Sequence, residues 1–401
     1  MIITEKTKIK EVIDNHPNSI YFFKNLGLAN LEDAKSPIKL LSLKSVSEIK
    51  KINLETLIKQ LNEYLKIETN KTDITLVENN KKGEIKVYGV LPCPVRVPLL
   101  EKLNEAITDF EEKNSTTVEV NLESASKGLG WLKDSVDFAD DKTIPDIIIS
   151  AGFEFLFSQN AQERIKKGFF IDCFPNKLND DFKDINLKDP FNALSVFAVV
   201  PAIFMINEQE LDNEKIPGSW EELLYGNYEN KVSIPVGDFD LFNSILLHIY
   251  KEFGESGIER LKKIMFKSLH PTVAVKTQQM KNTAKPAITV MPYFFSKMVR
   301  SLNSVKIVWP KDGAIISPIF ALIRKDSAEK IKPLIDTIFS KEVGNILSQH
   351  GLFPSLHKDV KNSLIEPANF KWVGWDYILN NDTENLINEL NKNFNEFIGV
   401  A

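Results

Sequence analysis

The sequence predicts an α/β protein in which strands and helices alternate over most of the chain. Two blocks of this alternation lie on either side of an apolar run at 193–206, and each has the spacing typical of a doubly wound parallel sheet. A smaller, mostly helical segment precedes them at 1–66. The 401 residues are enough for two or three domains of ordinary size.

The composition argues against several classes of protein. A formal net charge of −5 gives no sign of a basic surface, so neither a nucleic acid nor an anionic membrane is an expected partner. No apolar run reaches the length of about 18 residues that a membrane-spanning helix needs. The 2 Cys are too few for a disulfide scaffold, and the 5 His show no paired metal-ligand spacing. Nucleotide-binding and serine-nucleophile motifs are also missing, so no catalytic residue, metal site or cofactor is predicted.

Residues 1–66 are expected to form a small helical domain. Apolar side chains recur there at the spacing of an amphipathic helix, most clearly from Leu54 to Leu65. Helices are expected at Ile9–Asn15, at 17–26 and at 54–65. The polar stretch 67–84, rich in Lys, Asn, Thr and Glu, is expected to be a linker.

The first α/β block begins at Ile85, with strands expected in IKVYGVL, TTVEVNLE and IPDIIISAG. In a parallel sheet, ligands bind beyond the carboxyl ends of the strands, where the helices begin. The candidate binding loops of this block are therefore 91–98, 123–130 and 150–155.

Two side chains in the first loop have distinctive chemistry. Cys93 lies between prolines just before a predicted helix, a place that lowers the pKa of a thiol. It is interpreted either as a contact for a soft metal or reactive ligand, or as a small buried residue. Arg96 has the geometry to pair with a carboxylate or phosphate, although a surface ion pair is the alternative.

The other two loops are rich in small residues that expose backbone amides. Ser124, Ser126 and Gly128 are candidates for holding an oxyanion, and Ser150 and Gly152 are candidates on the same grounds. The simpler interpretation of both loops is an ordinary helix cap.

The second block, 193–304, offers three further candidates. Asp238 and Asp240 lie at a predicted helix start, where carboxylates either bind an amine or metal or simply complement the helix dipole. Tyr293 lies at a predicted turn from strand to helix and is a candidate for contacting the ligand.

The passage between the blocks has a recognisable order. The apolar run 193–206 is expected to form a pair of buried strands. It is followed by Asn207 and then by IPGSWEELL, in which Ser219 is placed to cap a helix. The strand-like YENKVSIP comes next. This order resembles the crossover into the second lobe of type 2 bacterial solute-binding proteins, the ligand-capturing subunits of ABC importers. The stretch GNILSQHGLFPS at 344–355 also resembles the closing pattern of that family.

The resemblance implies a two-lobed type II periplasmic-binding-protein fold, with two doubly wound sheets joined by a two-strand hinge. Lobe I would be 85–192 with 305–401, including a C-terminal tail, and lobe II would be 193–304. It implies non-catalytic binding of a small solute, with an anion or metal complex favoured, in a cleft that closes about the hinge. An ABC permease would be the partner. Iron-binding relatives tend to place a tyrosine pair at Tyr293, but phenylalanine follows it here, which argues against ferric iron.

Residues 1–66 resemble a small domain of unknown function that precedes some bacterial redox proteins. Relatives often carry a Cys pair just after the position of Gly27, which this chain lacks, so the domain is expected to bind a protein partner or to self-associate. The alternative is a folded appendage without an interaction role. No apolar stretch of signal-peptide length follows Met1, so a cytoplasmic location is expected, with an extracytoplasmic one as the alternative if a signal was removed. Two other functions stay open: a cytoplasmic ligand sensor or carrier that signals through 1–66, and an enzyme that uses Cys93 as nucleophile.

Overall fold

The computed structural model describes residues 3–16, 36–50, 82–124, 129–235, 239–268, 284–299 and 305–397, together with the single residues 19, 23, 28, 31, 54, 57, 58, 61, 62, 65, 275 and 278. The chain divides into a smaller unit, Met1–Glu78 with Asn391–Ala401, and a larger unit, Asn79–Leu390. The predicted boundaries of the domains and lobes stay predictions. The expected linker lies, up to residue 81, outside the described residues.

The smaller unit is helical, as expected. It contains α1 (Ile9–Asn15), the 3₁₀ helix η1 (Pro37–Leu40) and α3 (Leu43–Lys50). Every described residue of the expected helix 54–65 is helical, whereas only residues 19 and 23 of the helix expected at 17–26 are described. Its core consists of buried aliphatic and aromatic side chains: Ile3, Ile9, Val12, Phe23, Leu28, Leu31, Leu43, Val46, Leu57, Leu61 and Leu65.

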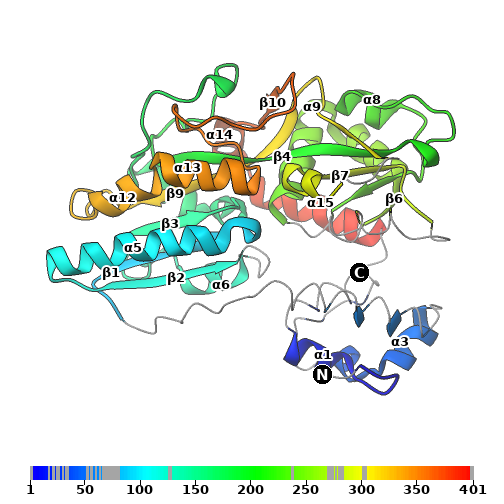
Figure 1. Ribbon diagram of the computed structural model, residues 1–401, viewed down its shortest axis with the longest axis horizontal. Helices are drawn as coiled ribbons and strands as arrows, with labels where there is room; N and C mark the ends of the chain where they lie inside the picture. The colour runs from blue at the N-terminus through cyan, green and yellow to red at the C-terminus, as the bar shows by residue number, and fades with distance from the viewer. Residues whose placement is uncertain are drawn as a thin grey trace. The chain divides into compact units, whose positions relative to one another are not determined.

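Lobe I of the larger unit is built on a parallel sheet in the order β2-β1-β3 (Figure 1). The strands are β1 (Ile85–Leu91), β2 (Val118–Ser124) and β3 (Ile147–Ser150). Every residue of β3 is buried, which explains its run of three isoleucines before Ser150. At Gly89 a Cβ atom would lie 1.9 Å from the carbonyl oxygen of Ile149, so only glycine lets β1 approach β3 this closely.

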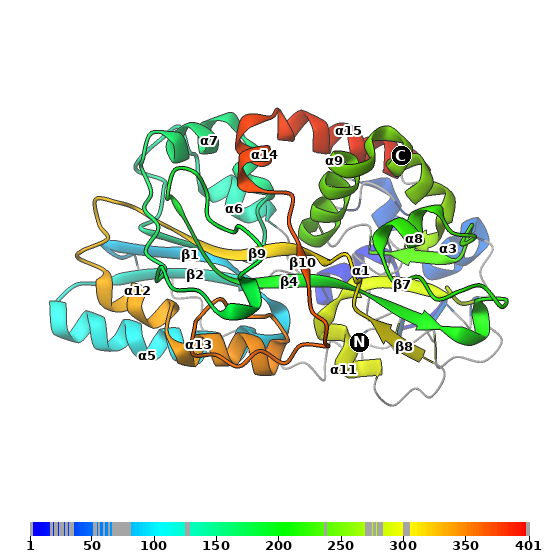
Figure 2. The same ribbon diagram turned by 90° about the horizontal axis from the view of Figure 1, so that it is seen from above.

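Helices cover both faces of the lobe I sheet (Figure 2). One face carries α5 (Arg96–Asn114), α12 (Lys332–Ile338) and α13 (Lys341–Asn345), and the other carries α6 (Gly130–Ser135), α7 (Gln159–Lys166) and α14 (Trp375–Asn380). Short helical turns connect these elements: η2 (Cys93–Val95), η4 (Glu154–Phe157), η5 (Asp180–Phe182) and η8 (Ile346–His350). Helix α15 (Thr383–Phe397) follows α14.

Lobe II has its own sheet, in which β7 (Ile288–Pro292) and β5 (Val232–Ile234) run parallel and β6 (Met265–Ser268) follows β5. The edge strand β8 (Val305–Val308) lies on the far side of β4. Helices α8 (Trp220–Tyr225) and α9 (Phe239–Ile264) cover one face, and η7 (Tyr293–Phe295) with α11 (Ser296–Val299) covers the other (Figure 2). The remaining turn is η6 (Glu208–Glu210).

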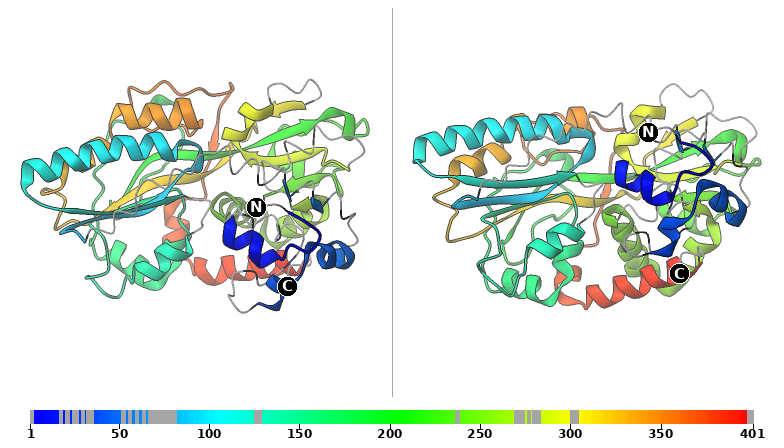
Figure 3. Two further views of the ribbon diagram at one scale, coloured as in Figure 1. Left: turned by 60° about the horizontal axis from the view of Figure 1, so that its bottom comes forward. Right: turned by 90° about the horizontal axis from the view of Figure 1, so that it is seen from below.

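Two long strands belong to the passage between the lobes, β4 (Leu194–Asn207) and β9 (Ala314–Ile323). The first half of β4 pairs with β9, and from Ala202 onward β4 pairs with β7 instead, so one strand serves both sheets (Figure 3, long green strand). The apolar run therefore forms a single strand of 14 residues, and the expected pair of strands is wrong, because β4 passes from one sheet into the other without a turn. A third segment passes the same place, because β10 (Phe370–Lys371) pairs with the start of β9.

The capped helix predicted after the crossover is confirmed. The Ser219 hydroxyl accepts the Glu222 N–H at 3.1 Å, and α8 begins at the next residue. Trp220 packs edge-on against Phe204 of β4 and donates its indole N–H to the Gly313 carbonyl at 3.1 Å. Together with the two sheets and the helical N-terminal region, this confirms the predicted fold class.

Candidate functional site

The candidate binding region lies at the strand ends of the two lobes. In lobe I, β1 leads into η2 and α5, and β3 leads into η4; in lobe II, β5 precedes α9, and β7 leads into η7 and α11. Backbone N–H groups at helix starts favour anions, and ligands bind at such strand ends in doubly wound sheets.

Arg96 lies at the strand ends of lobe I. It is the first residue of α5 and half-buried, and its Nη2 donates to the Leu122 carbonyl near the end of β2 at 3.3 Å. The guanidinium is therefore held beside the carboxyl ends of both β1 and β2. A cation fixed there supplies charge where the resemblance places a ligand.

Ser150 and Gly152 are brought together at the end of β3. The buried Ser150 hydroxyl donates to the Gly152 carbonyl at 2.5 Å and accepts the Gly152 N–H at 3.1 Å. These two hydrogen bonds close a local turn and leave the hydroxyl engaged. Neighbouring Glu154 of η4 forms an ion pair with Lys133 of α6 at 2.6 Å.

Tyr293 lies at the end of β7 but is packed inside the protein. It is only 3% exposed, and its hydroxyl donates to the Ser363 carbonyl at 2.9 Å. Its ring meets Trp309 edge-on, with centroids 5.2 Å apart. In this arrangement the phenol helps to hold the segment around residue 363 against lobe II.

The other predicted residues can be placed only by their backbone. Cys93 begins η2, Ser124 ends β2 and Asp240 is the second residue of α9, so all three lie at strand or helix ends as predicted. Their side chains, and the whole of Ser126, Gly128 and Asp238, lie outside the described residues. The ligand-binding roles of all ten predicted residues stay predictions.

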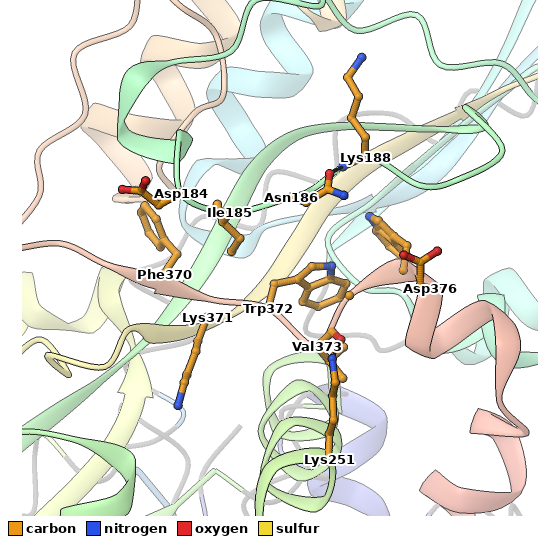
Figure 4. Close-up of a pocket in the computed structure, with 12 residues that line it drawn as sticks. Asp184, Ile185, Asn186, Lys188, Lys251, Phe370, Lys371, Trp372, Val373 and Asp376 are labelled. Carbon is orange, nitrogen blue, oxygen red and sulfur yellow. Dashed lines mark hydrogen bonds between the residues drawn. The ribbon is translucent and has the colours of Figure 1, made fainter.

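Sequence reasoning missed a pocket of about 360 Å³ at the hinge (Figure 4). It lies where a loop of lobe I, helix α9 of lobe II and the segment after β10 come together. Its walls are Asp184, Ile185, Asn186, Lys188, Lys251, Phe370, Lys371, Trp372, Val373, Gly374, Trp375 and Asp376. None of the ten predicted residues is among them. The signal available in the sequence was the aromatic run Phe370 to Trp375.

Two lysines at this pocket form contacts between segments that are distant in the sequence. Lys251 of α9 donates to the Val373 carbonyl at 2.8 Å, with its ammonium 5.4 Å from the centre of the Tyr377 ring. Lys371 of β10 pairs with Glu252 at 2.7 Å and with Asp312 at 3.1 Å. Figure 4 shows the Lys371 ammonium turned away from the pocket, so its charge serves these ion pairs.

His248 lies one turn before Glu252 on α9, with Nε2 3.2 Å from the Glu252 carboxylate. Burial, aided by the positive charge of Lys371, lowers the pKa of His248 to about 4. The imidazole is therefore neutral at physiological pH. Within the described ranges, no cluster of three or more His, Cys, Asp or Glu side chains is placed to hold a metal ion.

Two α/β lobes that share crossing strands, with helix starts at the strand ends of both, define a two-lobed ligand-binding protein. Comparison with known families makes this more specific. The chain belongs to the bacterial extracellular solute-binding protein family, whose model matches residues 142–381. Residues 3–58 match a domain of unknown function (DUF1858). Both matches confirm the resemblance inferred from the sequence.

Solved structures show the same fold. The ferric binding protein from Campylobacter jejuni has a TM-score of 0.54 at 17% identity, covering 78% of this chain and 99% of its own. An ABC transporter structure from Clostridium perfringens has a TM-score of 0.53 at 17% identity, covering 77% and 99%. A periplasmic binding protein from Actinobacillus pleuropneumoniae with fructose-6-phosphate bound has 0.51 at 15%, covering 80% and 100%. No curated protein matches the chain.

The expectation of a cytoplasmic location is wrong, because the family is extracellular. The extracytoplasmic alternative agrees with the family. The alternative function as a cytoplasmic sensor is not favoured, because it depended on a cytoplasmic location. The missing apolar stretch near Met1 was therefore a misleading signal. Among the described helices, none combines the length and the apolar character needed to cross a membrane.

Proposed function

We propose that this protein binds a small anionic solute, or an anionic metal complex, between its lobes and passes it to an ABC-type permease. The observation that carries the proposal is the pairing of β4, which joins the lobe I sheet with one half and the lobe II sheet with the other. Such a strand allows the lobes to rotate about it and enclose a ligand. The proposed role is binding without chemistry, in keeping with the family.

The hinge is assigned to the point where β4 changes partners. Pro201 pairs with Ile316 of β9, and the next residue, Ala202, pairs with Pro292 of β7. Proline has no N–H to donate, so the ladder has fewer hydrogen bonds where the two sheets meet. A strand that is weakly bonded at one point bends there at little cost.

The preference for an anion rests on charge at the strand ends. Arg96 stands at the amino end of α5, a helix of 19 residues whose dipole places partial positive charge at that end. One solved relative by fold holds fructose-6-phosphate, and another is a ferric binding protein. A bare ferric ion is disfavoured for two reasons. The Tyr293 hydroxyl already donates to the Ser363 carbonyl, and a ferric ion would need several other oxygen ligands beside the Tyr293 oxygen.

The test begins with native mass spectrometry of the purified protein, followed by calorimetric titration with fructose 6-phosphate, citrate and ferric citrate. Arg96→Gln is expected to weaken binding of the anion by roughly 10- to 100-fold, the usual effect of one charge-assisted hydrogen bond. Arg260→Gln is the matched control. Arg260 is also half-buried and also donates to a backbone carbonyl, that of Leu224, but it lies on α9 away from the strand ends.

The outcomes separate the parts of the proposal. Unchanged affinity in Arg96→Gln would place the ligand elsewhere, and equal weakening in both variants would mean a general loss of structure. Binding of neutral solutes alone would overturn the anion class. The function predicted for residues 1–66, binding of a partner or self-association, stays a prediction.

A further inference from the structure

The pocket at the hinge, called the hinge pocket below, is separate from the strand ends at which the solute is proposed to bind. It has a volume of about 360 Å³ and lies between the loop 184–188, helix α9 and the segment 370–376. In Figure 1, β10 and α14 lie above the long strand β4, whereas α5 and α6 lie below it. Sites for small molecules have volumes of about 300 to 1,000 Å³, so the hinge pocket has room for one small molecule.

Hydrogen bonds between the walls hold the hinge pocket in shape. Trp375 donates its indole N–H to the Leu187 carbonyl at 2.9 Å, which joins the segment after β10 to the loop 184–188. On the opposite side, Lys251 donates to the Val373 carbonyl at 2.8 Å and joins the same segment to α9. A pocket whose walls are already in place binds a ligand without the cost of ordering them.

Trp372, in the wall of the hinge pocket, has an indole N–H group without an acceptor. Its side chain is buried, since the residue is only 8% exposed, and Nε1 has no hydrogen-bond partner in the described part of the chain. Figure 4 shows this nitrogen turned toward the loop that carries Asn186. A buried N–H group that lacks an acceptor is costly. Trp372 therefore offers a hydrogen bond to an oxygen atom placed in the pocket.

Asn186 supplies a second donor from the opposite wall. Its side-chain oxygen accepts the backbone N–H of Lys188 at 3.1 Å, which fixes the orientation of the amide group. Figure 4 shows the amide nitrogen on the side nearer to Trp372. The two N–H groups of this amide are thus presented to the same space as the indole N–H.

The charged groups of the hinge pocket disfavour a charged ligand. The ammonium group of Lys188 donates to Asn176 Oδ1 at 2.7 Å, and Lys251 and Lys371 are engaged in the contacts described above. The carboxylate of Asp376, which is exposed, lies at the edge of the pocket and would repel an anion (Figure 4). The ammonium group of Lys251 would in turn repel a cation. Hydroxyl groups suit this mixture, because each can accept from an N–H group and donate to a carboxylate.

We propose that the hinge pocket is a second binding site, which takes a small neutral molecule with several hydroxyl groups, such as a monosaccharide. Its oxygen atoms accept hydrogen bonds from Trp372 and Asn186, and one of its hydroxyl groups donates to Asp376. The rings of Trp372 and Trp375 meet edge-on with centroids 5.1 Å apart and provide the aromatic surface for the carbon atoms of the ligand. This site is additional to the one between the lobes and does not depend on the function proposed for it.

The experiment uses the full chain with its 5 tryptophans replaced by 5-fluorotryptophan, so that each gives its own fluorine resonance. The resonances of Trp372 and Trp375 are assigned with the variants Trp372→Phe and Trp375→Phe. Glucose, galactose and ribose are then titrated separately. We expect at least one of these sugars to shift both resonances until they saturate, while those of Trp131, Trp220 and Trp309 stay in place. If none of the three sugars shifts the two pocket resonances, the proposal is overturned.

A matched pair of variants tests the contact with Asn186. Asn186→Asp keeps the oxygen that accepts from Lys188 but removes the amide N–H groups, so it is expected to weaken sugar binding by about tenfold. Asn176→Asp is the control. Asn176 is also exposed and also accepts from Lys188, but it does not line the pocket, and its variant is expected to bind the sugar as before. Equal affinities in the two variants would overturn the assignment.

Two charged probes and one further titration complete the test. Shifts of the pocket resonances by citrate or choline, without shifts by the sugars, would overturn the neutral class of ligand. Asn186→Asp is expected to leave the calorimetric titration with fructose 6-phosphate unchanged, because the proposed solute site lies at the strand ends. A parallel loss in that titration would mean that the two sites are one. A failure of the solute proposal alone would leave the sugar-dependent resonances of Trp372 and Trp375 as they are.

Discussion

Buried polar side chains are used differently in two regions of the larger unit. In the pre-β4 segment, defined as residues 172–193 together with the first two residues of β4, they are hydrogen-bonded to the surrounding chain. In a lobe II group made of Ser233, Thr289 and His248, polar atoms are buried without a hydrogen bond in the described part of the protein. The comparison distinguishes polar residues whose hydrogen bonds stabilise the fold from polar residues that are buried without such hydrogen bonds.

In the pre-β4 segment, side-chain hydrogen bonds take the place of the backbone hydrogen bonds that regular secondary structure would provide. Asn179 donates to the carbonyls of Val360 at 2.6 Å and His357 at 3.2 Å. The Ser195 hydroxyl donates to the Asp172 carboxylate at 2.9 Å. Buried backbone groups need partners, and outside regular structure only side chains or water can provide them.

In the lobe II group, the backbone groups are already hydrogen-bonded, in the sheet for Ser233 and Thr289 and in helix α9 for His248. Ser233 of β5 and Thr289 of β7 are paired across the parallel ladder, and both are at most 1% exposed. Their hydroxyls, like the Nδ1 atom of His248, have no hydrogen bond in the described ranges. These hydroxyls therefore contribute little stability and cost some desolvation.

Of the substitutions that test this contrast, the one at Asn179 is expected to have the largest effect. Asn179→Ala removes the donors to Val360 and His357 and leaves two carbonyls without them. We expect the free energy of unfolding to fall by about 3 kcal/mol, measured by urea denaturation. A loss below about 1 kcal/mol would mean that the pre-β4 segment does not depend on its side chains.

The next effect is the pH dependence due to His248. Its folded pKa of about 4 lies below the ordinary 6.5, because the neutral ring is buried. Stability from this group is fully present above pH 6.5 and is lost as pH falls toward 4, since the unfolded chain takes up the proton first. Between pH 7.5 and 5 the loss should be about 2 kcal/mol. His248→Gln should flatten this part of the curve in urea titrations, and an unchanged slope would assign it to other groups.

The smallest effect is expected for a matched pair of hydroxyl deletions. Ser195→Ala should lower the free energy of unfolding by about 1.5 kcal/mol, because it removes the bond to Asp172 and the acceptor of the Cys173 N–H. Thr289→Val keeps the shape of a buried side chain that has no described partner, so it should change stability by less than about 0.5 kcal/mol. Thermal unfolding of the two variants tests the pair. Equal losses of stability in the two variants would contradict the comparison between the pre-β4 segment and the lobe II group.

Local signals in the sequence predicted much of the fold. Ser219 caps α8 through an N–H three residues away, and the apolar run to Asn207 needed only its own composition to indicate a buried strand. Such features depend on neighbours in sequence, so residue patterns carry them.

The candidate site was less predictable, because its contacts join distant parts of the chain. The position of Tyr293 at a strand end was foreseeable, but the partner of its hydroxyl is Ser363. The hinge pocket likewise combines the loop at 184–188 with the segment 370–376, and no spacing in the sequence brings the two together. Only the packing of both lobes defines it.

The shared strand β4 also has a consequence for how the protein is made. The strands of the lobe II sheet, from Ala202 of β4 to Val308 of β8, follow one another along the chain, whereas the lobe I sheet must pair Ile147 of β3 with Ile323 of β9. During synthesis, the β3 edge therefore stays unpaired until lobe II has been translated. Such long-range pairing is slow and leaves a strand edge open to aggregation. We expect lobe II to acquire its structure first on the ribosome, and the lobe I sheet to be completed last.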